Sequence, residues 1–145
     1  AMAAATRSER QIALLLFDID GFKAVNDTLG HEAGDRMLQE IALRVGRRVR
    51  QADTFARVGG DEFVLLMELA RDPSDAGRVA DTLIQVIDGI DIYADAGLHI
   101  GASIGIACYS PAAGHNPTPG DLLKRADRAM YEAKRGGKGC YRIAA

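Results

Sequence analysis

The sequence predicts an α/β domain of the α+β type, with a βαββαβ core and helices packed on one face of a central antiparallel sheet. Two observations carry this prediction. Apolar strand-like runs alternate with amphipathic helical segments in the order strand, helix, strand, strand, helix, strand, helix, strand. The two middle runs are joined by a short link that contains two glycines, which is typical of a β-hairpin. This arrangement is the ferredoxin-like, or palm-type, fold class, and 145 residues suffice for one such domain.

The first predicted strand covers Gln11 to Phe17 and is apolar on both faces, although its periodicity alone also allows a turn of helix. Asp18 and Asp20 follow it directly. Helix capping explains Asp20 as well as any other role does. Asp18 is different, because a carboxylate at the end of a buried strand requires a partner or a cation.

Three segments are predicted to be amphipathic helices, because their apolar positions recur at intervals of three and four residues. They are residues 32–50, 72–89 and 118–136. The first ends in a basic cluster, which suits the negative end of the helix dipole. The third begins with a capping box from Thr118 to Asp121. Residues 98–109 and 140–143 are predicted to be strands, and residues 111–117 a loop.

The predicted hairpin has Thr54–Ala56 and Phe63–Met67 as its arms. In the predicted topology the returning arm lies beside the first strand, so that Asp18 meets the hairpin tip with Asp61 and Glu62. Three carboxylates so close together are unfavourable unless a cation lies between them, and Mg²⁺ prefers such ligands. The two glycines of the link leave backbone amides open to a ligand. Taken alone, the link is equally well a glycine-rich turn with solvated acids.

Composition excludes several classes of function. A net charge of −2 and the absence of Trp argue against binding to nucleic acid polymers. No segment approaches the roughly 20 apolar residues of a membrane span, and no secretory signal is present. The isolated Cys108 and Cys140 are typical of a reducing compartment, so we expect a cytoplasmic domain. Residues 1–10 are interpreted as a linker or cloning remnant, and residues 11–145 as the domain.

Motifs along nearly the whole chain from Ile12 onward resemble those of the GGDEF family of diguanylate cyclases. The family takes its name from a signature that matches Gly59–Phe63 at the hairpin. The other matching motifs, which follow the family's order, are Phe17–Lys23 with Asn26-Asp27, Gly30-His31 with Gly34-Asp35, Ser103–Ala107, and Ala126–Lys134.

This resemblance implies an enzyme that joins two GTP molecules into cyclic di-GMP and releases two pyrophosphates, with one GTP held by each of two facing domains. It implies two Mg²⁺ ions per site, held by Asp18, the main-chain carbonyl of Ile19, Asp61 and Glu62. Asp61 and Glu62, together with Lys23, are then the catalytic residues. The resemblance also implies a set of substrate-binding residues. Some read guanine, some hold the triphosphate, and some leave room for it: Phe22, Asn26, Asp35, Gly59, Gly60, Lys134 and Lys138.

Within this set, Asn26 and Asp35 are expected to read the guanine edge. Lys23, Lys134 and Lys138 are expected to hold the triphosphate, although the last two also fit the plain role of cations at a helix end. Phosphoryl transfer needs positioning and charge neutralisation, which these residue types supply.

Arg50 and Asp53 stand at the spacing of the family's inhibitory product site, Arg-x-x-Asp. The arginine fork suits both phosphate and guanine. Two features depart from the family pattern. The usual leading helix and its motif are absent before the first strand, and Lys138-Gly139 stands where Arg-Asn is more frequent. Partners expected from the resemblance are GTP, cyclic di-GMP and a second GGDEF domain in a weak homodimer.

Two alternatives stay open at this stage. One is a non-catalytic GGDEF module that binds GTP or cyclic di-GMP and regulates a neighbouring domain. The other is an interaction domain of ferredoxin-like fold, which binds no nucleotide.

Overall fold

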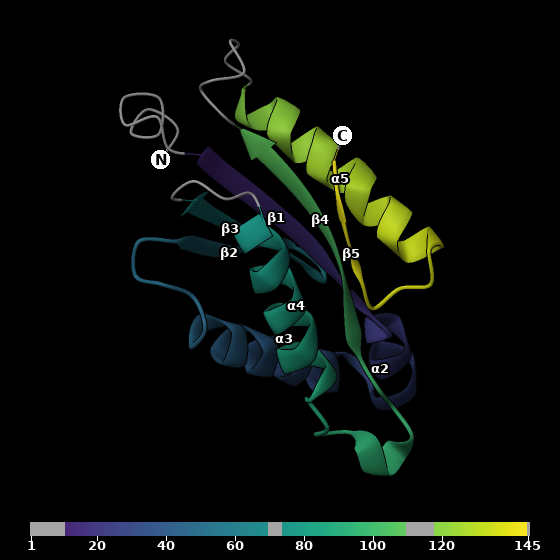
Figure 1. The fold of residues 1–145 in the computed structure, drawn as a ribbon. Helices are drawn as coiled ribbons and strands as arrows, with labels where there is room; N and C mark the ends of the chain where they lie inside the picture. Colours follow the sequence, from purple (N-terminus) through teal and green to yellow (C-terminus); the bar gives the residue numbers. More distant parts are fainter. Residues whose placement is uncertain (1–10, 70–73, 110–117, 145) are drawn as a thin grey trace.

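The computed structural model describes residues 11–69, 74–109 and 118–144 (Figure 1). The predicted linker at 1–10 and loop at 111–117 lie outside the described residues. The elements are β1 (Gln11–Asp20), α2 (Phe22–Leu29), α3 (His31–Gly46), β2 (Thr54–Gly59), β3 (Glu62–Leu69), α4 (Ser74–Asp88), a 3₁₀ turn (Ala94–Ala96), β4 (Gly101–Tyr109), α5 (Pro119–Arg135) and β5 (Tyr141–Ile143). The predicted α+β class and element order are confirmed. Within the described ranges, no helix is both long enough and apolar enough to cross a bilayer.

The helices differ from the sequence prediction in two main respects. The short helix α2 was not expected, because only Phe22 and Val25 form its buried side and two apolar positions give little periodicity. Helix α3 ends at Gly46, four residues earlier than predicted. The predicted capping box of α5 is present, with the Thr118 side chain accepting from the Asp121 amide.

The sheet has the strand order β2-β3-β1-β4-β5, with β1 in the centre. β1 runs antiparallel to both β3 and β4, and its residue Asp18 is in register with Glu62 on one side and Ser103 on the other. β5 pairs with β4 in parallel. The sheet is therefore mixed, whereas the sequence prediction was a purely antiparallel sheet. The reason is that α5 connects these neighbouring strands as a crossover, which returns the chain to run in the same direction.

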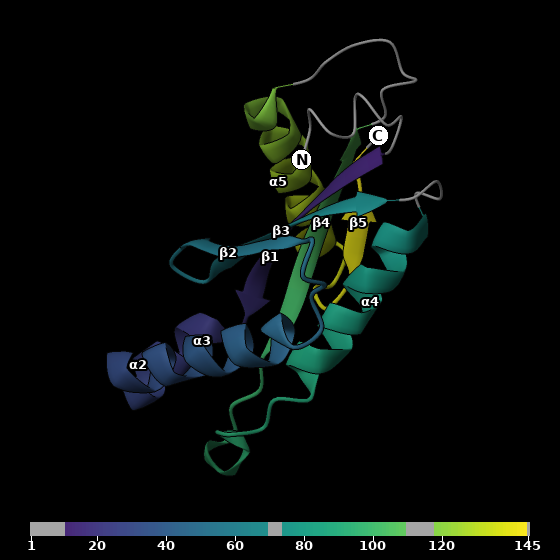
Figure 2. The same ribbon diagram turned by 90° about the vertical axis from the view of Figure 1, so that its left-hand side faces the viewer.

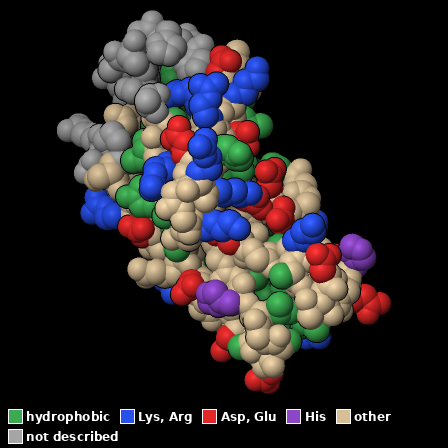
Figure 3. All heavy atoms as spheres, turned by 90° about the vertical axis from the view of Figure 1, so that its right-hand side faces the viewer, with side chains coloured by type: hydrophobic (Ala, Val, Ile, Leu, Met, Phe, Trp, Pro, Cys, Tyr) green, Lys and Arg blue, Asp and Glu red, His purple; other side chains and the backbone are tan. Residues whose placement is uncertain are grey.

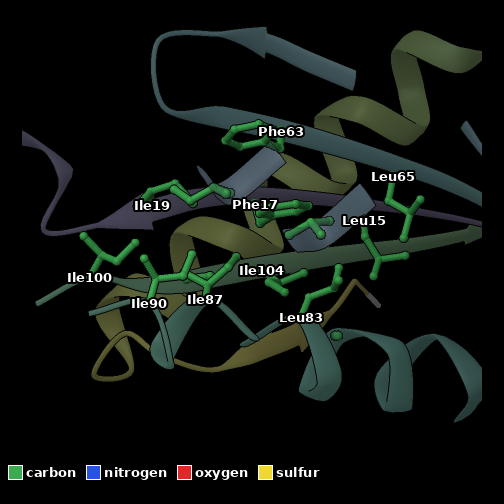
Figure 4. Packing of buried hydrophobic residues seen from close by; sticks show 14 of the residues in the cluster. Leu15, Phe17, Ile19, Phe63, Leu65, Leu83, Ile87, Ile90, Ile100 and Ile104 are labelled. Atoms are coloured by element: carbon green, nitrogen blue, oxygen red, sulfur yellow. The ribbon is translucent and has the colours of Figure 1, made fainter. Parts of the chain in front are cut away.

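Helices cover both faces of the sheet, so the expectation of helices on one face was wrong. In Figure 2, α5 lies across the sheet from α3 and α4. The larger core cluster joins one face of β1 to α2, α3 and α4, and the smaller cluster joins the other face to α5. Figure 4 shows the larger cluster, where Phe17 and Phe63 stack at a centroid distance of 5.5 Å. A strand that is apolar on both faces needs cover on both, and β1 is such a strand.

The α5-facing row of β1 changes character along its length. Successive side chains on one face of a strand are two residues apart. This row begins with Ile12, Leu14 and Leu16, which pack in the smaller cluster, and it continues with Asp18 and Asp20. The strand therefore delivers two carboxylates to the end of an apolar layer, beside the hairpin tip.

Candidate active site

Asp18 is the one acidic residue among the described residues that is buried, with 9% of its surface exposed. Its Oδ2 accepts a hydrogen bond from Lys134 Nζ on α5. Its Oδ1 is buried and has no hydrogen-bond donor among the described residues. A buried carboxylate oxygen without a partner is unfavourable. One carboxylate oxygen of Asp18 thus has a hydrogen-bond partner in the protein, and the other could accept a ligand.

The hairpin tip lies against the end of β1, as predicted. Gly59 pairs with Glu62, which leaves Gly60 and Asp61 as the turn. The Asp61 carbonyl accepts the Ile19 amide at 3.2 Å, and this bond fixes the turn to β1. Gly60 has a φ of 51°, a value that glycine adopts without strain. A Cβ added at either glycine would have no heavy atom within 4 Å, so the approach to the tip is open.

Burial, together with nearby carboxylates, raises the pKa values of the two hairpin acids. Burial raises the pKa of Asp61 to about 6, helped by hydrogen bonding to Asp18 and by its negative charge. Burial also raises the pKa of Glu62, with the charges of Asp18 and Asp127 adding to the effect. Lys134 acts in the opposite direction on both acids. The Asp61 carboxyl can donate to Asp18 only when Asp61 is protonated, and an ionised Asp61 is repelled by the charge of Asp18.

Burial alone would lower the pKa of Lys134. The hydrogen bond to Asp18 and the charges of Asp18, Asp61 and Asp20 outweigh that effect and raise the pKa overall. Lys134 is therefore a fixed positive charge within an acidic group.

The donor set fits Mg²⁺, although it does not form a complete cage. Across residues 11–69, 74–109 and 118–144, no three acidic, His or Cys side chains are arranged as ligands of one ion. Mg²⁺ seldom uses such a cage, because it is bound by one or two carboxylates together with water and substrate phosphates. The unpaired Asp18 oxygen and the neighbouring Asp61 and Glu62 supply that smaller set.

The two residues predicted to read guanine lie on adjacent helices. Asn26 on α2 faces the first turn of α3, where a Cβ added at Gly34 would lie 1.8 Å from Asn26 Oδ1. Glycine is therefore required for Asn26 to occupy its place. Phe22 is buried in the larger core cluster, and its ring also borders Gly34, with Cζ 3.2 Å from the added Cβ. Phe22 thus supports the helix pair from within the core.

Asp35, next along α3, is exposed and lines a hollow of about 540 Å³. The opposite wall comes from the hairpin and includes Phe55, Arg57 and Phe63. Arg57 Nε donates to the Gly60 carbonyl at 2.8 Å. The hollow therefore extends from α3 to the hairpin, and the Asp35 carboxylate and the hairpin lie on one surface.

The three predicted lysines differ in their surroundings. Lys134 is held by Asp18, while Lys23 is an exposed residue in the first turn of α2. Lys138 is exposed in the turn after α5 and has a φ of 63°. On the face of the molecule that includes α5, Lys and Arg side chains gather beside acidic ones (Figure 3). Lys134 therefore reaches the carboxylates from α5, and Lys138 follows it in the turn after that helix.

Arg50 and Asp53 form a compact pair remote from the hairpin tip. Arg50 Nη2 lies 3.2 Å from Asp53 Oδ1 and donates to the Glu68 carbonyl at 2.9 Å. Glu68 is near the end of β3, whereas the tip is at its beginning. The pair lines a second hollow of about 420 Å³ together with Arg48 and Arg78. The Arg-x-x-Asp residues thus form a surface that is separate from the acidic cluster of Asp18, Asp61 and Glu62.

A family model described as "Diguanylate cyclase, GGDEF domain" matches residues 1–140. The chain is a GGDEF domain. It is 47% identical over 141 residues to the bifunctional diguanylate cyclase/cyclic di-GMP phosphodiesterase MucR of Pseudomonas aeruginosa, covering 97% of this chain and 20% of that protein. It is 41% identical to the response regulator PleD of Caulobacter vibrioides, covering 92% of this chain and 29% of PleD. The GGDEF domain therefore spans a third or less of these relatives.

Solved structures agree with the fold of this GGDEF domain. The GGDEF domain of YfiN (TpbB) from Pseudomonas aeruginosa superimposes with a TM-score of 0.88 at 40% identity, covering 99% of this chain and 88% of that one. The GGDEF domain of DgcB from Caulobacter crescentus, solved in complex with c-di-GMP, has a TM-score of 0.84 at 28% identity. That alignment covers 97% of this chain and 82% of the other.

Two contacts of the GGDEF domain were missed from its sequence. Lys134 was expected to hold phosphate and not to pair with Asp18. Asp20 was considered a helix cap, yet its carboxylate accepts from Ser103 and from the Gly139 amide. The isolated serine at the start of β4, which lies among apolar residues, is the signal that could have indicated a polar partner on β1.

Proposed function

We propose that this GGDEF domain is a diguanylate cyclase that condenses two GTP molecules into cyclic di-GMP and releases two pyrophosphates. The observation that supports the proposal most directly is the meeting of Asp18 with Asp61 and Glu62 at an open, glycine-lined tip. The family membership and the named diguanylate cyclases among the relatives support the same reaction. GTP is available in the cytoplasm, where we place the domain.

Mg²⁺ is the proposed cofactor, with two ions per site. Asp18, the Ile19 carbonyl, Asp61 and Glu62 would hold them. When bound, such ions neutralise phosphate charge and make an attacking hydroxyl more acidic. The unpaired Asp18 oxygen argues for this assignment.

The side chains of this domain would act on two parts of GTP. In the reaction a 3′-oxygen bonds to the α-phosphorus of the other GTP, and the bond from that phosphorus to the pyrophosphate oxygen breaks. Asp61 and Glu62 would accept the proton of the 3′-hydroxyl. Lys23, Lys134 and Lys138 would neutralise the triphosphate and the departing pyrophosphate.

Guanine selection is assigned to Asn26 and Asp35, with Phe22 and Gly34 holding Asn26 in place. A carboxylate at Asp35 accepts from the N1–H and amino donors of guanine, which adenine lacks. A site built on such hydrogen bonds discriminates strongly, because the wrong base leaves its polar groups unpaired. Gly59 and Gly60 would leave room for the ribose and phosphates.

The reaction requires two copies of the domain, because each supplies one GTP site. Large exposed apolar side chains of the described residues are dispersed over several elements: Leu29 on α2, Leu43 on α3, Val58 on β2, Ile92 between α4 and the 3₁₀ turn, Leu123 and Tyr131 on α5, and Ile143 on β5. Stable homodimers bury a broader apolar surface. We therefore infer a weak homodimer that forms around two bound nucleotides.

Product feedback is assigned to Arg50 and Asp53. Both residues line a hollow away from the hairpin tip, so cyclic di-GMP bound there would leave the acidic cluster free. The DgcB structure in complex with c-di-GMP is consistent with product binding by this family. Bound product would hold two domains in an arrangement that separates their tips.

The test is direct. Concentrated domain is incubated with GTP and Mg²⁺, and the nucleotides are separated by liquid chromatography. We expect cyclic di-GMP and pyrophosphate from the unmodified protein, and none from Asp61→Asn or Glu62→Gln proteins that retain their circular dichroism spectrum. Binding of GTP without any product at high protein concentration would instead identify a non-catalytic nucleotide-binding module. No GTP binding by calorimetry would leave only an interaction domain.

A further inference from the structure

Asp20 joins three segments that are distant in sequence. Its Oδ1 and Oδ2 lie 2.8 and 3.0 Å from Ser103 Oγ, which donates to the carboxylate. Its Oδ2 also accepts the main-chain amide of Gly139 at 3.1 Å. Ser103 is fully buried in β4. The end of β1, the beginning of β4 and the turn after α5 thus meet at one carboxylate.

This use of Asp20 replaces the helix cap suggested by the sequence. The N-cap of α2 is Gly21, and no side chain caps that helix. A Cβ added at Gly21 would lie 2.6 Å from the His99 carbonyl oxygen, so the chain turns tightly at this point. Asp20 precedes this turn, and its carboxylate accepts from β4 and from Gly139 instead of from α2.

The turn from Gly136 to Gly139 needs such an anchor. The amides of Gly136, Gly137 and Lys138 donate to carbonyls of α5, with the Lys138 N–H bonded to the Ala133 carbonyl at 3.1 Å. The Gly139 amide donates to Asp20 instead. Gly137, Lys138 and Gly139 have φ values of 119°, 63° and 59°. A side chain at positive φ is unfavourable and persists only where the surroundings fix the backbone.

We propose that Asp20 is a positioning residue that, through Ser103 and the Gly139 amide, holds Lys138 in place to bind the triphosphate of GTP. The inference rests on the proposed function, because Lys138 is assigned to the triphosphate there. Lys138 is the residue next to Gly139, and it is exposed. Without the Asp20 bond, the Lys138 side chain would sample many positions and its ammonium group would bind phosphate less well.

The experiment compares the dissociation constants of GTP and GMP, measured by calorimetry with Mg²⁺ on each protein. The ratio of the two constants isolates the contribution of the outer phosphates. Asp20→Ala should reduce the preference for GTP about tenfold, as expected for the loss of one well-placed charged contact. Its affinity for GMP should stay unchanged. Asp20→Asn should retain most of the preference, because one amide oxygen at the Oδ2 position can accept from both Ser103 and Gly139.

A double-mutant cycle with Lys138→Ala separates positioning from a general structural role. In the Lys138→Ala background, Asp20→Ala should cause no further loss of the GTP preference. Equal losses in both backgrounds would show that Asp20 acts independently of Lys138 and would overturn the proposal. A parallel loss of GTP and GMP affinity by Asp20→Ala would do the same, because it would indicate a general disturbance of the site.

Folding and the proposed function are controlled separately. If Asp20→Ala does not fold, Ser103→Ala removes one of the two donors and should give a smaller loss of the GTP preference; an unchanged ratio there would overturn the proposal. If the unmodified domain binds GTP no better than GMP, the triphosphate assignment fails, and this inference fails with it. If the unmodified domain prefers GTP and Asp20→Ala prefers it equally, only the positioning role fails.

Discussion

Lys134 Nζ donates a hydrogen bond to Asp18 Oδ2, although the two residues are 116 positions apart in the chain. The contact connects α5 to the end of β1 at the edge of the smaller core cluster. It supplies one partner to a buried carboxylate and leaves the other oxygen unpaired. The charge of the site is therefore set by helix packing as well as by the hairpin.

Replacing Lys134 by Ala should remove cyclic di-GMP formation and destabilise the fold. Asp18 would lose its only cationic partner among the described contacts, and a buried acceptor without a partner costs about 1–3 kcal/mol. Urea unfolding and product formation would be measured on the same protein. Arg135→Ala is the matched control, because Arg135 contacts the Tyr131 ring and not Asp18. Equal effects of the two substitutions would contradict the role of the Lys134–Asp18 pair.

The helix pair α2–α3 should determine base preference. Gly34→Ala places a Cβ 1.8 Å from Asn26 Oδ1 and must displace that side chain. We expect Gly34→Ala to lower GTP affinity by at least about tenfold. In favourable hydrogen-bonded sites such a preference exceeds about 10⁴-fold. Asp35→Ala should reduce the preference for GTP over ATP to about 10²-fold or less. Gly46→Ala is the control, because a Cβ there contacts nothing within 4 Å. An unchanged GTP/ATP preference in Asp35→Ala would show that guanine is read elsewhere.

Arg50→Ala should retain turnover and lose product inhibition. Its side chain lines the hollow remote from the tip, so its removal leaves the acidic cluster intact. Initial rates would be measured over a range of added cyclic di-GMP. Arg47→Ala removes an equal charge from the same end of α3 without touching the hollow, and it should remain inhibited. If both variants are inhibited alike, the feedback site does not include Arg50.

The pH dependence of stability should carry the signature of Asp61. Its pKa rises from 3.8 to about 6 on folding, so between these values the folded state holds more protons than the unfolded state. Stability then falls as pH rises through this window and is level above it. Chemical denaturation of the metal-free domain from pH 4 to pH 7 would measure the slope. Asp61→Asn should flatten it, whereas Asp81→Asn on α4 should not. A rise in stability across the same window would contradict the shift.

Gly105 permits the close contact of β4 with α5. A Cβ there would lie 1.9 Å from the Ala126 carbonyl oxygen and 2.3 Å from the Met130 amide nitrogen. Gly105→Ala should destabilise the domain by about 1–3 kcal/mol or more, because backbone atoms cannot move aside as side chains do. Gly120→Ala, in the first turn of α5, would bring its Cβ no closer than 3.7 Å to another side chain, that of Thr118, and should be neutral or slightly stabilising. Thermal unfolding of both variants decides the matter, and equal melting temperatures would contradict the close packing.

The sequence was sufficient for the parts of the site that strand order determines. The apolar run of β1 and the two arms of the hairpin placed Asp18 beside Asp61 and Glu62, because register follows from topology. It was insufficient where a side chain must reach across layers. The partner of Lys134 depends on the rotation of α5 over the sheet, and that of Asp20 depends on the path of the turn after it. The predicted one-sided helical cover was wrong for a different reason: β1 is apolar on both faces, and this signal in the sequence already required cover on both.

The central position of β1 also has a consequence for the order in which the chain folds. β1 is the first element that the structure describes, yet the residues paired with it follow 44–58 positions later in β3 and 81–97 positions later in β4. Pairings so distant in sequence close slowly, because the loops between them must first be ordered. During synthesis an apolar strand would therefore leave the ribosome long before either neighbour and wait with both edges unpaired. Pulsed hydrogen exchange during refolding should show the amides of β1 becoming protected no earlier than those of β3, its neighbour nearer in sequence; early protection of β1 alone would contradict this order.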